Sequence, residues 1–451
     1  MNPIERRAAI SLALIYATRM LGLFMILPVF AIYAEQLMYM TPFLVGLAIG
    51  IYGLTQAAFQ IPFGAWSDRI GRKPVIVIGL LIFVLGSVVA ALAESIYGVI
   101  IGRALQGMGA IASAVMALAS DLTREQHRTK VMAIIGASIG ASFMLALVLG
   151  PVLQTWVGVP GIFWLTAMLA VIGIVVIVFL IPTPVQANIQ SAALGRVGLG
   201  AVVSDGQLLR LDMGVFILHM ALTAIFVIVP ILLRDQFDIS VASHWKVYLS
   251  VLVISLLLLV PTIIFSEKFN KTKASFSSAI LLCASGMLIM FITENSFGIF
   301  FFAMVLFFWG FNFLEASLPS LVSKLSYPHT KGMSMGVFSS SQFLGAFAGG
   351  VIAGLILQNY GQNVVFLFAL IMFLIWFLVA SSMQAPVDYK SYTVQLGARS
   401  NIQVDQVAAS LQALPGVVEV TVIAEESVAY LRVNKNTFDE DQVAAYCGQI
   451  N

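Results

Sequence analysis

Long apolar stretches separated by short polar segments fill most of this 451-residue chain. A helix of about 20 apolar residues is long enough to cross the hydrocarbon core of a bilayer. The pattern meets this requirement twelve times and therefore predicts twelve membrane-spanning helices. The predicted spans are residues 9–33, 42–66, 73–93, 96–120, 129–154, 160–181, 211–234, 244–265, 274–292, 296–322, 331–357 and 362–382.

One polar segment divides these spans into two groups of six. Residues 183–210 are rich in Gln, Ala, Ser and Gly, and such a segment is too polar to cross a membrane. We therefore predict an N-terminal six-helix bundle over residues 1–182, a cytoplasmic linker over 183–210, and a C-terminal six-helix bundle over 211–384.

A faint internal repeat relates the two predicted bundles. Residues 67–73 align with 266–272, and residues 128–132 align with 329–333, in each case six spans later. Parallel repeats of six spans are typical of one large class of secondary transporters.

The composition agrees with a membrane protein. Hydrophobic residues make up 60% of the chain and charged residues only 10%, which leaves too little polar surface for a soluble globule. The two cysteines, Cys283 and Cys447, lack the spacing of metal ligands. Because the chain also lacks a nucleotide-binding loop and a Ser/His/Asp set, we expect no enzyme activity, no cofactor, no metal and no nucleic-acid partner.

Basic residues predict the orientation in the bilayer. If both termini are cytoplasmic, the inner loops contain fifteen Lys and Arg residues, and the outer loops contain only Arg234 and Lys246. Cytoplasmic loops of membrane proteins carry such an excess. We expect Glu35, Glu94 and Glu294, at the outer ends of their spans, to be solvated.

The last part of the chain, residues 388–451, lacks long apolar runs and has more acidic than basic residues. Its periodicity predicts strands at 389–396, 417–423 and 428–433 and helices at 404–414 and 439–447. This βαββα order resembles a small α+β ferredoxin-like domain. We expect a cytoplasmic module that regulates or dimerises the protein, through contacts with the cytoplasmic face or a partner.

A charged hairpin between the second and third spans is the most specific motif. It consists of Gly64, Asp68, Arg69, Gly71, Arg72 and Lys73. Together with the twelve spans and the central break, this signature resembles the major facilitator superfamily over most of residues 4–383. The resemblance implies two six-helix bundles, a multi-pass protein of a bacterial inner membrane, and alternating access to a small-molecule substrate.

The resemblance also implies a switching role for the hairpin. Asp68 is expected to lie beside the start of span 11, near Lys331, and Arg72 to pair with Asp121 at the end of span 4. These contacts would hold the cytoplasmic side shut in the outward-facing state. The alternative is that the basic residues only reflect the excess of positive charge on the cytoplasmic side.

Two further motifs narrow the resemblance. Arg103 with Gln106 in span 4 is similar to a family motif associated with proton transfer. Gly140, Gly150 and Pro151 in span 5 resemble the helix-packing motif of exporters in the twelve-span drug:proton antiporter group. That fit is partial, because the residues after Pro151 are not the usual glycines.

Four residues are candidates for proton coupling. Glu315 is the one acid that the pattern places deep in a span, and a buried carboxyl group is suited to bind and release a proton near neutral pH. Arg103 and Arg19 are cations within spans, which are costly and often functional, and His219 has a suitable side chain. The alternatives are a permanently neutral Glu315, a packing role for His219, and structural contacts or snorkelling for the arginines.

The substrate cavity is expected between the inner faces of spans 1, 4, 7 and 10. Aromatic and weakly polar side chains suited to its lining are Phe24, Tyr33, Phe226, Phe308 and Asn312. Few fixed charges there favour lipophilic or weakly polar solutes over sugars and phosphates.

These observations predict a monomeric secondary transporter that exports amphipathic compounds in exchange for protons. A proton-coupled importer or a facilitator of a metabolite stays open, because the exporter motif is incomplete. A third alternative is a sensor that binds a ligand through the acidic C-terminal domain and does not transport.

Overall fold

The computed structural model of the protein describes residues 1, 3–182, 198–269, 271–326, 331–383, 389–395, 404–423, 428–434 and 438. The chain forms two compact units, Met1–Met383 and Gln384–Asn451. We refer to them as the helical unit and the C-terminal unit and describe each by itself.

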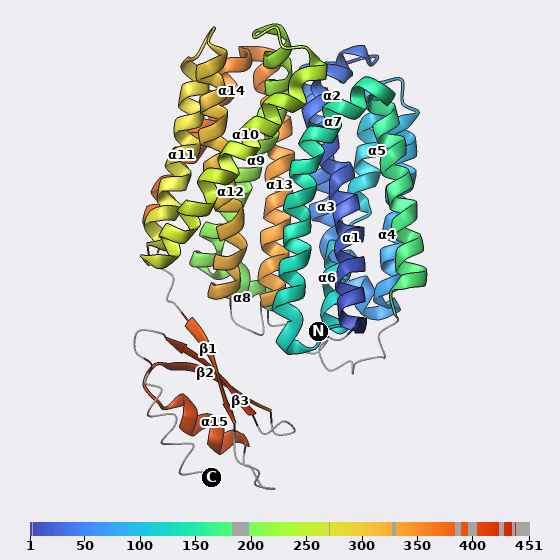
Figure 1. Ribbon diagram of the computed structural model, residues 1–451. Coiled ribbons are helices and arrows are strands. Elements are labelled where there is room, and N and C mark those ends of the chain that lie inside the picture. Colours follow the sequence, from blue (N-terminus) through green and yellow to red (C-terminus); the bar gives the residue numbers. More distant parts are fainter. Residues whose placement is uncertain are drawn as a thin grey trace. The chain divides into compact units, whose positions relative to one another are not determined.

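The helical unit contains two groups of helices (Figure 1). The N-terminal bundle comprises α1 (Pro3–Met25), α2 (Leu27–Tyr33), η1 (Ala34–Gln36), α3 (Pro42–Ile70), α4 (Arg72–Ala91), α5 (Ile96–Met108), α6 (Ala112–Asp121), α7 (Glu125–Val175) and η2 (Val176–Leu180). The second half comprises α8 (Gly198–Ser204), α9 (Gly206–Asp235), η5 (Val241–Ser243), α10 (His244–Lys268), α11 (Thr272–Ile292), α12 (Phe297–Leu325), α13 (Lys331–Tyr360) and α14 (Gln362–Ser381). We call α9–α14 the C-terminal bundle.

The described helices provide twelve crossings. Eleven apolar stretches are long enough to span a membrane, and one of them, Lys130–Leu180, has 51 residues. Gly158 interrupts this stretch with a φ of +65°, a conformation that glycine adopts at little cost. The stretch therefore supplies two spans, and the prediction of a mostly helical membrane protein is confirmed.

Helix α9 begins before the predicted seventh span. The Asp205 carboxylate caps it by accepting hydrogen bonds from the backbone N–H groups of Gln207 and Leu208, at 2.8 and 3.3 Å. Hydropathy does not detect this polar first turn. As a consequence, Asp212 lies well inside the helix rather than at its margin.

Two predicted spans are broken in the middle. Ile26 separates α1 from α2, two residues before Pro28, and residues 109–111 separate α5 from α6. A break leaves backbone carbonyl groups without helical partners, and the Gly109 oxygen accepts a hydrogen bond from Arg19 at 2.8 Å instead.

The two ends of the helical unit differ in how the bundles meet. We call the end with residues 68–73 the hairpin end, and the end with Glu35 the Glu35 end. At the Glu35 end, α3 packs directly against α13, and a Cβ built on Gly46 would clash with the carbonyl oxygen of Gly350 and the reverse. Only glycine permits such a close approach of two helix backbones. We call this contact the glycine seam.

Open space lies beside the helices nearer the hairpin end. No atom lies within 4 Å of a Cβ built on Gly136 or Gly140 in α7, or on Gly332 or Gly336 in α13. The described parts of the bundles are therefore in tight contact at the Glu35 end and less closely packed at the hairpin end.

The C-terminal unit contains a three-stranded antiparallel sheet. Its elements are β1 (Tyr389–Gln395), α15 (Val404–Gln412), β2 (Val417–Ile423) and β3 (Val428–Asn434), and the strand order is β1-β3-β2. Because β3 is antiparallel to both neighbours, β1 and β2 are parallel and flank it, as in a split βαβ unit. The predicted helix at 439–447 lies outside the described residues, so the ferredoxin-like assignment stays a prediction.

Candidate functional site

The hairpin between α3 and α4 is shaped by two glycines. Gly71 has a φ of +98°, which is strained for any residue with a side chain. A Cβ on Gly64 would lie 3.1 Å from Ser113 Oγ in α6, so Gly64 brings α3 close to α6. The turn can therefore reverse the chain and stay packed on its own bundle.

The charged residues of the hairpin bind mainly within the N-terminal bundle. Arg72 contacts Asp68, and its Nε lies 3.2 Å from Asp121 Oδ2. Its Nη1 also donates to Ser67 Oγ at 2.7 Å, and Lys73 donates to the Ile181 carbonyl oxygen at 2.7 Å. The pairing of Arg72 with Asp121 is the one that the sequence suggested, whereas Arg69 is exposed.

The structure shows no contact between Asp68 and the start of α13 among the described residues. The Asp68 side chain is 57% exposed, and a Cβ on Gly332 would have no neighbour within 4 Å. The side chain of Lys331 lies outside the description. The predicted contact of Asp68 with the start of α13 is therefore not seen in this structure, and its role in closing the cytoplasmic side stays a prediction.

Arg19 is buried in the N-terminal bundle, where it is 2% exposed. Its Nη2 donates to Gln56 Oε1 at 2.6 Å and to the Gly109 carbonyl oxygen at 2.8 Å. Its guanidinium carbon also lies 5.9 Å from the ring centroid of Tyr52 and 5.6 Å from that of Phe83. Amide, carbonyl and aromatic groups therefore stabilise this cation.

Arg103 is held in a similar way and also lies against the Tyr52 ring. It is 1% exposed and donates to the carbonyl oxygens of Ala48 and Ile49 at 3.4 Å and to Gln106 Oε1 at 3.0 Å. Its guanidinium carbon lies 5.1 Å from the Tyr52 centroid. No ion pair with a carboxylate is seen for either arginine in the described part of the chain.

The C-terminal bundle brings Glu315 and His219 together. Glu315 Oε2 in α12 lies 3.6 Å from His219 Nε2 in α9, and the Gln342 side-chain nitrogen in α13 lies 2.7 Å from the same His219 atom. His219 Nδ1 lies 3.2 Å from the Val215 carbonyl oxygen. Because a carbonyl oxygen only accepts hydrogen bonds, this contact places the proton of a neutral His219 on Nδ1.

Glu315, predicted to lie deep within a span, is not the most buried acid among the described residues. The Glu315 side chain is 39% exposed, whereas Asp212 and Glu5 are 6% and 3% exposed. Glu5 binds Arg124 at 2.8 Å, and this hydrogen bond raises the pKa of Arg124. Asp212 Oδ2 has no hydrogen-bond partner among the described residues, and Asp212 precedes His219 by two helical turns on one face of α9.

Aromatic side chains connect the two bundles next to His219. The ring centroid of Phe143 in α7 lies 5.1 Å from that of Phe24, 6.5 Å from that of Phe226 and 6.2 Å from that of Phe311. Phe311 also lies 6.0 Å from the His219 ring. This aromatic cluster (Phe24, Phe143, Phe226, Phe311) is a suitable apolar wall for a binding site.

The other predicted cavity residues are less central. Phe308 is 1% exposed and packs on Phe311, and Asn312 donates to Ser255 Oγ at 3.1 Å. Tyr33 lies at the end of α2, with Phe30 as its aromatic neighbour. The described contacts do not bring Tyr33 to the aromatic cluster.

The glycines of span 5 occupy different environments. Gly150 approaches α1 so closely that a Cβ there would clash with the Met25 carbonyl oxygen, and Pro151 is buried beside it. Gly140 faces open space. In this structure the packing role predicted for the motif is therefore visible at Gly150 and not at Gly140.

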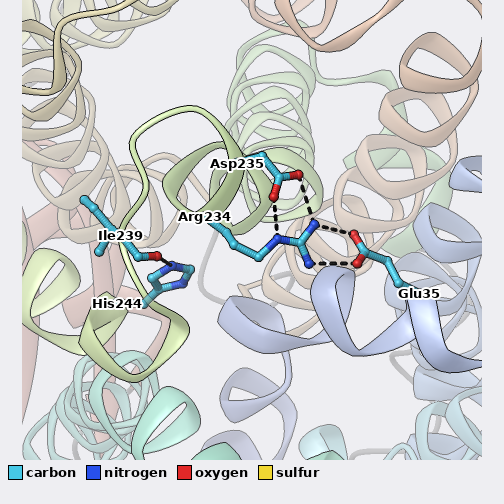
Figure 2. Close-up of polar contacts among 5 residues, drawn as sticks. All are labelled: Glu35, Arg234, Asp235, Ile239 and His244. Atoms are coloured by element: carbon cyan, nitrogen blue, oxygen red, sulfur yellow. Dashed lines mark hydrogen bonds and ion pairs between the residues drawn. The ribbon is translucent and has the colours of Figure 1, made fainter.

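An ion pair joins the bundles at the Glu35 end (Figure 2). Arg234, in the last turn of α9, donates to both carboxylate oxygens of Glu35 at 2.7 and 2.8 Å. It also binds the neighbouring Asp235 at 2.5 and 2.9 Å. Glu35 was expected to be solvated, but it is held in a two-pronged pair with the other bundle.

Comparison with known proteins shows which family has this arrangement of two bundles and a charged hairpin. The sequence profile described as Major Facilitator Superfamily matches residues 12–211 and again residues 211–410. The chain belongs to the Major Facilitator Superfamily. The double match also agrees with an internal repeat of two halves.

Relatives within the superfamily are transporters. The chain is 43% identical over 448 residues to the inner membrane transport protein YajR of Escherichia coli, and the match covers 98% of both chains. It is 26% identical to the multidrug resistance protein MdtH of Aeromonas hydrophila, over 76% of this chain and 85% of that protein. The chain is therefore a multi-pass inner-membrane secondary transporter, and the expectation that it is not an enzyme is confirmed.

Solved structures of the superfamily share the fold. A bacterial homologue of the human lysosomal transporter Spinster, in an inward-facing and occupied conformation, superimposes with a TM-score of 0.68. The match covers 85% of this chain and 98% of that chain at 13% identity. A similarity this distant supports the fold alone.

Sequence reasoning missed several residues of this superfamily member's polar and aromatic core. Phe143, Gln342 and Asp212 were not singled out, and Glu35 was not expected to pair with Arg234. Asp212 could have been found from its spacing of seven residues to His219, which places both side chains on one helix face. The pairing of Glu35 with Arg234 had a weaker signal, since Arg234 is one of only two cations predicted at that end.

Proposed function

We propose that the protein is a proton-driven antiporter that exports small amphipathic compounds by alternating access. The observation that carries the proposal is the group formed by His219, Glu315 and Gln342, which holds two titratable side chains 3.6 Å apart. Glu315 is partly exposed, and the open space at Gly140 and Gly336 lies toward the hairpin end.

The hydrogen bonds of His219 suggest how this group handles a proton. In the neutral form Nδ1 donates to Val215 O, and Nε2 accepts from the Gln342 amide at 2.7 Å. A proton added at Nε2 would require the Gln342 amide to turn and would direct an N–H group toward Glu315. Gain of a proton by the imidazole would therefore act directly on the neighbouring carboxylate.

The surroundings of the pair suggest the class of solute. The aromatic cluster provides an apolar surface, and the Glu315 carboxylate provides an acceptor for a cationic or hydrogen-bonding group. A bound amphipathic solute and a proton would compete for Glu315. The printed name of the relative in Aeromonas hydrophila, a multidrug resistance protein, supports export of this kind of compound.

The excess of basic residues at the hairpin end favours a cytoplasmic location for it and for both termini. With this orientation the structure corresponds to an inward-facing state, and closure would bring Asp68 to the start of α13. The coupling ion would be the proton, without a resident cofactor or metal, and the transporter would act as a monomer in the lipid bilayer without a nucleic-acid partner.

A proton-flux screen tests this function. Protein is reconstituted in vesicles with the hairpin end inside, loaded with candidate solutes and a pH-sensitive dye. We expect an acid exterior to drive extrusion of the solute together with proton entry. Uptake of external solute under the same gradient would instead show an importer, and binding without substrate-dependent proton flux would show a sensor.

The C-terminal unit is proposed to be a ferredoxin-like regulatory domain. The split βαβ arrangement of β1, α15, β2 and β3 supports this assignment. A chain ending at Met383 should still exchange solute for protons and should lose only a dependence on conditions or partners. Complete loss of transport by the folded, truncated chain would show that the domain is part of the transport machinery.

A further inference from the structure

His244 lies next to the ion pair that joins the bundles at the Glu35 end (Figure 2). It is the first residue of α10 and is 0% exposed. Its Nε2 lies 3.1 Å from the Ile239 carbonyl oxygen. Since that oxygen can only accept a hydrogen bond, Nε2 carries the proton and Nδ1 presents a bare lone pair. Nδ1 is buried and has no hydrogen-bond partner in the described part of the structure.

We propose that His244 is a second proton-binding site, whose protonation opens the Glu35 end. The inference rests on the proposed alternating access. It adds His244 as the side chain that controls whether the bundles separate at the Glu35 end. The closed arrangement is stable only with a neutral His244 imidazole. Acid on the Glu35 side would protonate His244 and so favour an open arrangement in which water reaches this side chain.

Three features of the closed arrangement act against an imidazolium at His244. The side chain is fully buried, and burial of a charge without a partner is costly. A protonated Nδ1 would be an N–H donor without an acceptor. Finally, His244 occupies the first turn of α10, where the positive end of the helix dipole repels a cation.

A charged His244 could stay buried only if a nearby negative charge compensated it, so the surrounding charged residues matter. Arg234 adds a positive charge that acts on His244. The carboxylates of Glu35 and Asp235 are both bound to Arg234 and are 37% and 53% exposed, which weakens their effect at a buried site through solvent screening.

The helices packed against η5 and α10 provide few charges that could compensate a protonated His244. Helix α7 carries no charged residue between Val131 and Val175, and the nearest charged groups on α11 and α12 are distant along their helices, at Lys273 and Glu315. Two further titratable side chains are Cys283 of α11 and Tyr248 of α10, whose ring centroid lies 6.3 Å from that of His244. The remaining charged groups of this end, among the described residues, are Glu94, Asp238, Lys246 and Glu294.

The location of His244 connects its charge to the closure of the unit. The segment from Arg234 to His244 joins α9 to α10, and the packing contacts of η5 and α10 include α7 of the other bundle. A charge that destabilises this segment therefore acts on the ion pair and on the cross-bundle contact together. The adjoining glycine seam has no charge of its own and would open with them.

A pair of spin labels measures this opening. Leu92→Cys in the N-terminal bundle and Ile292→Cys in the C-terminal bundle are suitable positions, since both side chains are exposed, at 67% and 64%. The background carries Cys283→Ala and Cys447→Ser. The distance distribution is recorded in lipid nanodiscs between pH 8 and pH 5. As the pH falls, we expect the ratio of open to closed molecules to rise. One proton bound per opening limits this rise to about tenfold for each pH unit.

Three variants separate His244 from other causes. His244→Gln keeps an N–H donor for Ile239 and cannot take up the proton, so it should stay closed at pH 5. Lys246→Gln, two residues away and exposed, should open like the unmodified chain. Arg234→Gln, which removes the ion pair, should be open at both pH values.

Opening of His244→Gln with an unchanged pH dependence would overturn the inference, as would an unmodified chain whose distance does not change. Should His244→Gln not fold, the chemical shift of the imidazole nitrogens gives the same answer. The chain has 4 histidines, and the imidazole assigned to His244 must be the one that titrates together with the distance change.

A second label pair keeps the two proposals apart. Phe179→Cys and Phe269→Cys, which are 77% and 54% exposed, report on the hairpin end. The distance of this pair could change with a transported solute while the distance of the pair at the Glu35 end does not change with pH. That result would support alternating access and contradict the role proposed for His244. If neither pair ever changes, the proposed function itself fails.

Discussion

The two bundles hold different chemistry at their polar cores, although a repeat relates them. The N-terminal bundle buries Arg19 and Arg103 among amide, carbonyl and aromatic groups. The C-terminal bundle places the carboxylate of Glu315 beside the imidazole of His219. A guanidinium keeps its proton at every physiological pH, whereas a carboxylate next to an imidazole can exchange one. The first bundle therefore holds fixed charges, and the second holds the pair to which we assign proton exchange in the proposed mechanism.

The largest expected effect comes from Glu315→Gln. The amide is similar in size to the carboxyl group but cannot carry a proton, so proton-driven transport should fall on the order of 100-fold, as when a proton-transfer group is removed. Substrate-dependent proton flux in vesicles measures the loss. Glu267→Gln, at an exposed acid of α10, is the matched control, and equal activity of the two variants would remove Glu315 from the mechanism.

The next effect concerns stability. Arg103→Lys keeps the charge but loses the forked contacts to Ala48, Ile49 and Gln106, and leaving such buried groups unpaired should cost about 2 kcal/mol. A lower midpoint of thermal unfolding in detergent would show this, with the exposed Arg7→Lys as control. A stable Arg103→Lys protein that loses proton coupling would break the comparison, because the N-terminal bundle would then take part in proton transfer.

His219→Gln should have a smaller effect on transport. The glutamine can still form hydrogen bonds beside Gln342 but cannot titrate, so we expect a loss of roughly 10-fold, at the lower end of proton-transfer effects. The pH dependence of exchange should also change, because one proton-binding side chain is removed. An unchanged pH dependence would point to another group, for which buried Asp212 is the first candidate.

The smallest effect is expected at the hairpin. Asp121→Asn removes one partner of Arg72, and because both side chains are partly exposed, at 20% and 33%, the loss should stay below about 1 kcal/mol. Arg72 would keep its contacts with Asp68 and Ser67. Chemical denaturation in detergent measures the difference, and a much larger loss would mean that the hairpin stabilises the whole N-terminal bundle.

The spans of the helical unit were predictable because each needs only one long apolar run. The break at residues 109–111 was not, since it lies inside such a run and depends on the tertiary contact of Arg19 with the Gly109 carbonyl oxygen. The break at Ile26 had a signal in Pro28, because proline lacks a helical N–H donor. Helix α9 was placed too late because its polar first turn depends on the Asp205 cap, which hydropathy ignores.

The site was predictable only residue by residue. Glu315 and His219 attracted attention as polar groups in apolar spans, but their proximity depends on how α9 and α12 pack. Phe143 gave no signal, because one phenylalanine in an apolar helix resembles any other. Glu35 and Arg234 come from different bundles, and their pairing requires the closed arrangement of the Glu35 end.

The glycine seam between α3 and α13 has a consequence for the speed of the conformational cycle. Where Gly46 and Gly350 meet, backbone atoms touch without side chains between them. Parting and rejoining this surface freezes no rotamers, so each closure loses little entropy there. The glycine seam can therefore separate and re-form quickly. The rate of the cycle would then depend on charged groups, which respond to solute and acid.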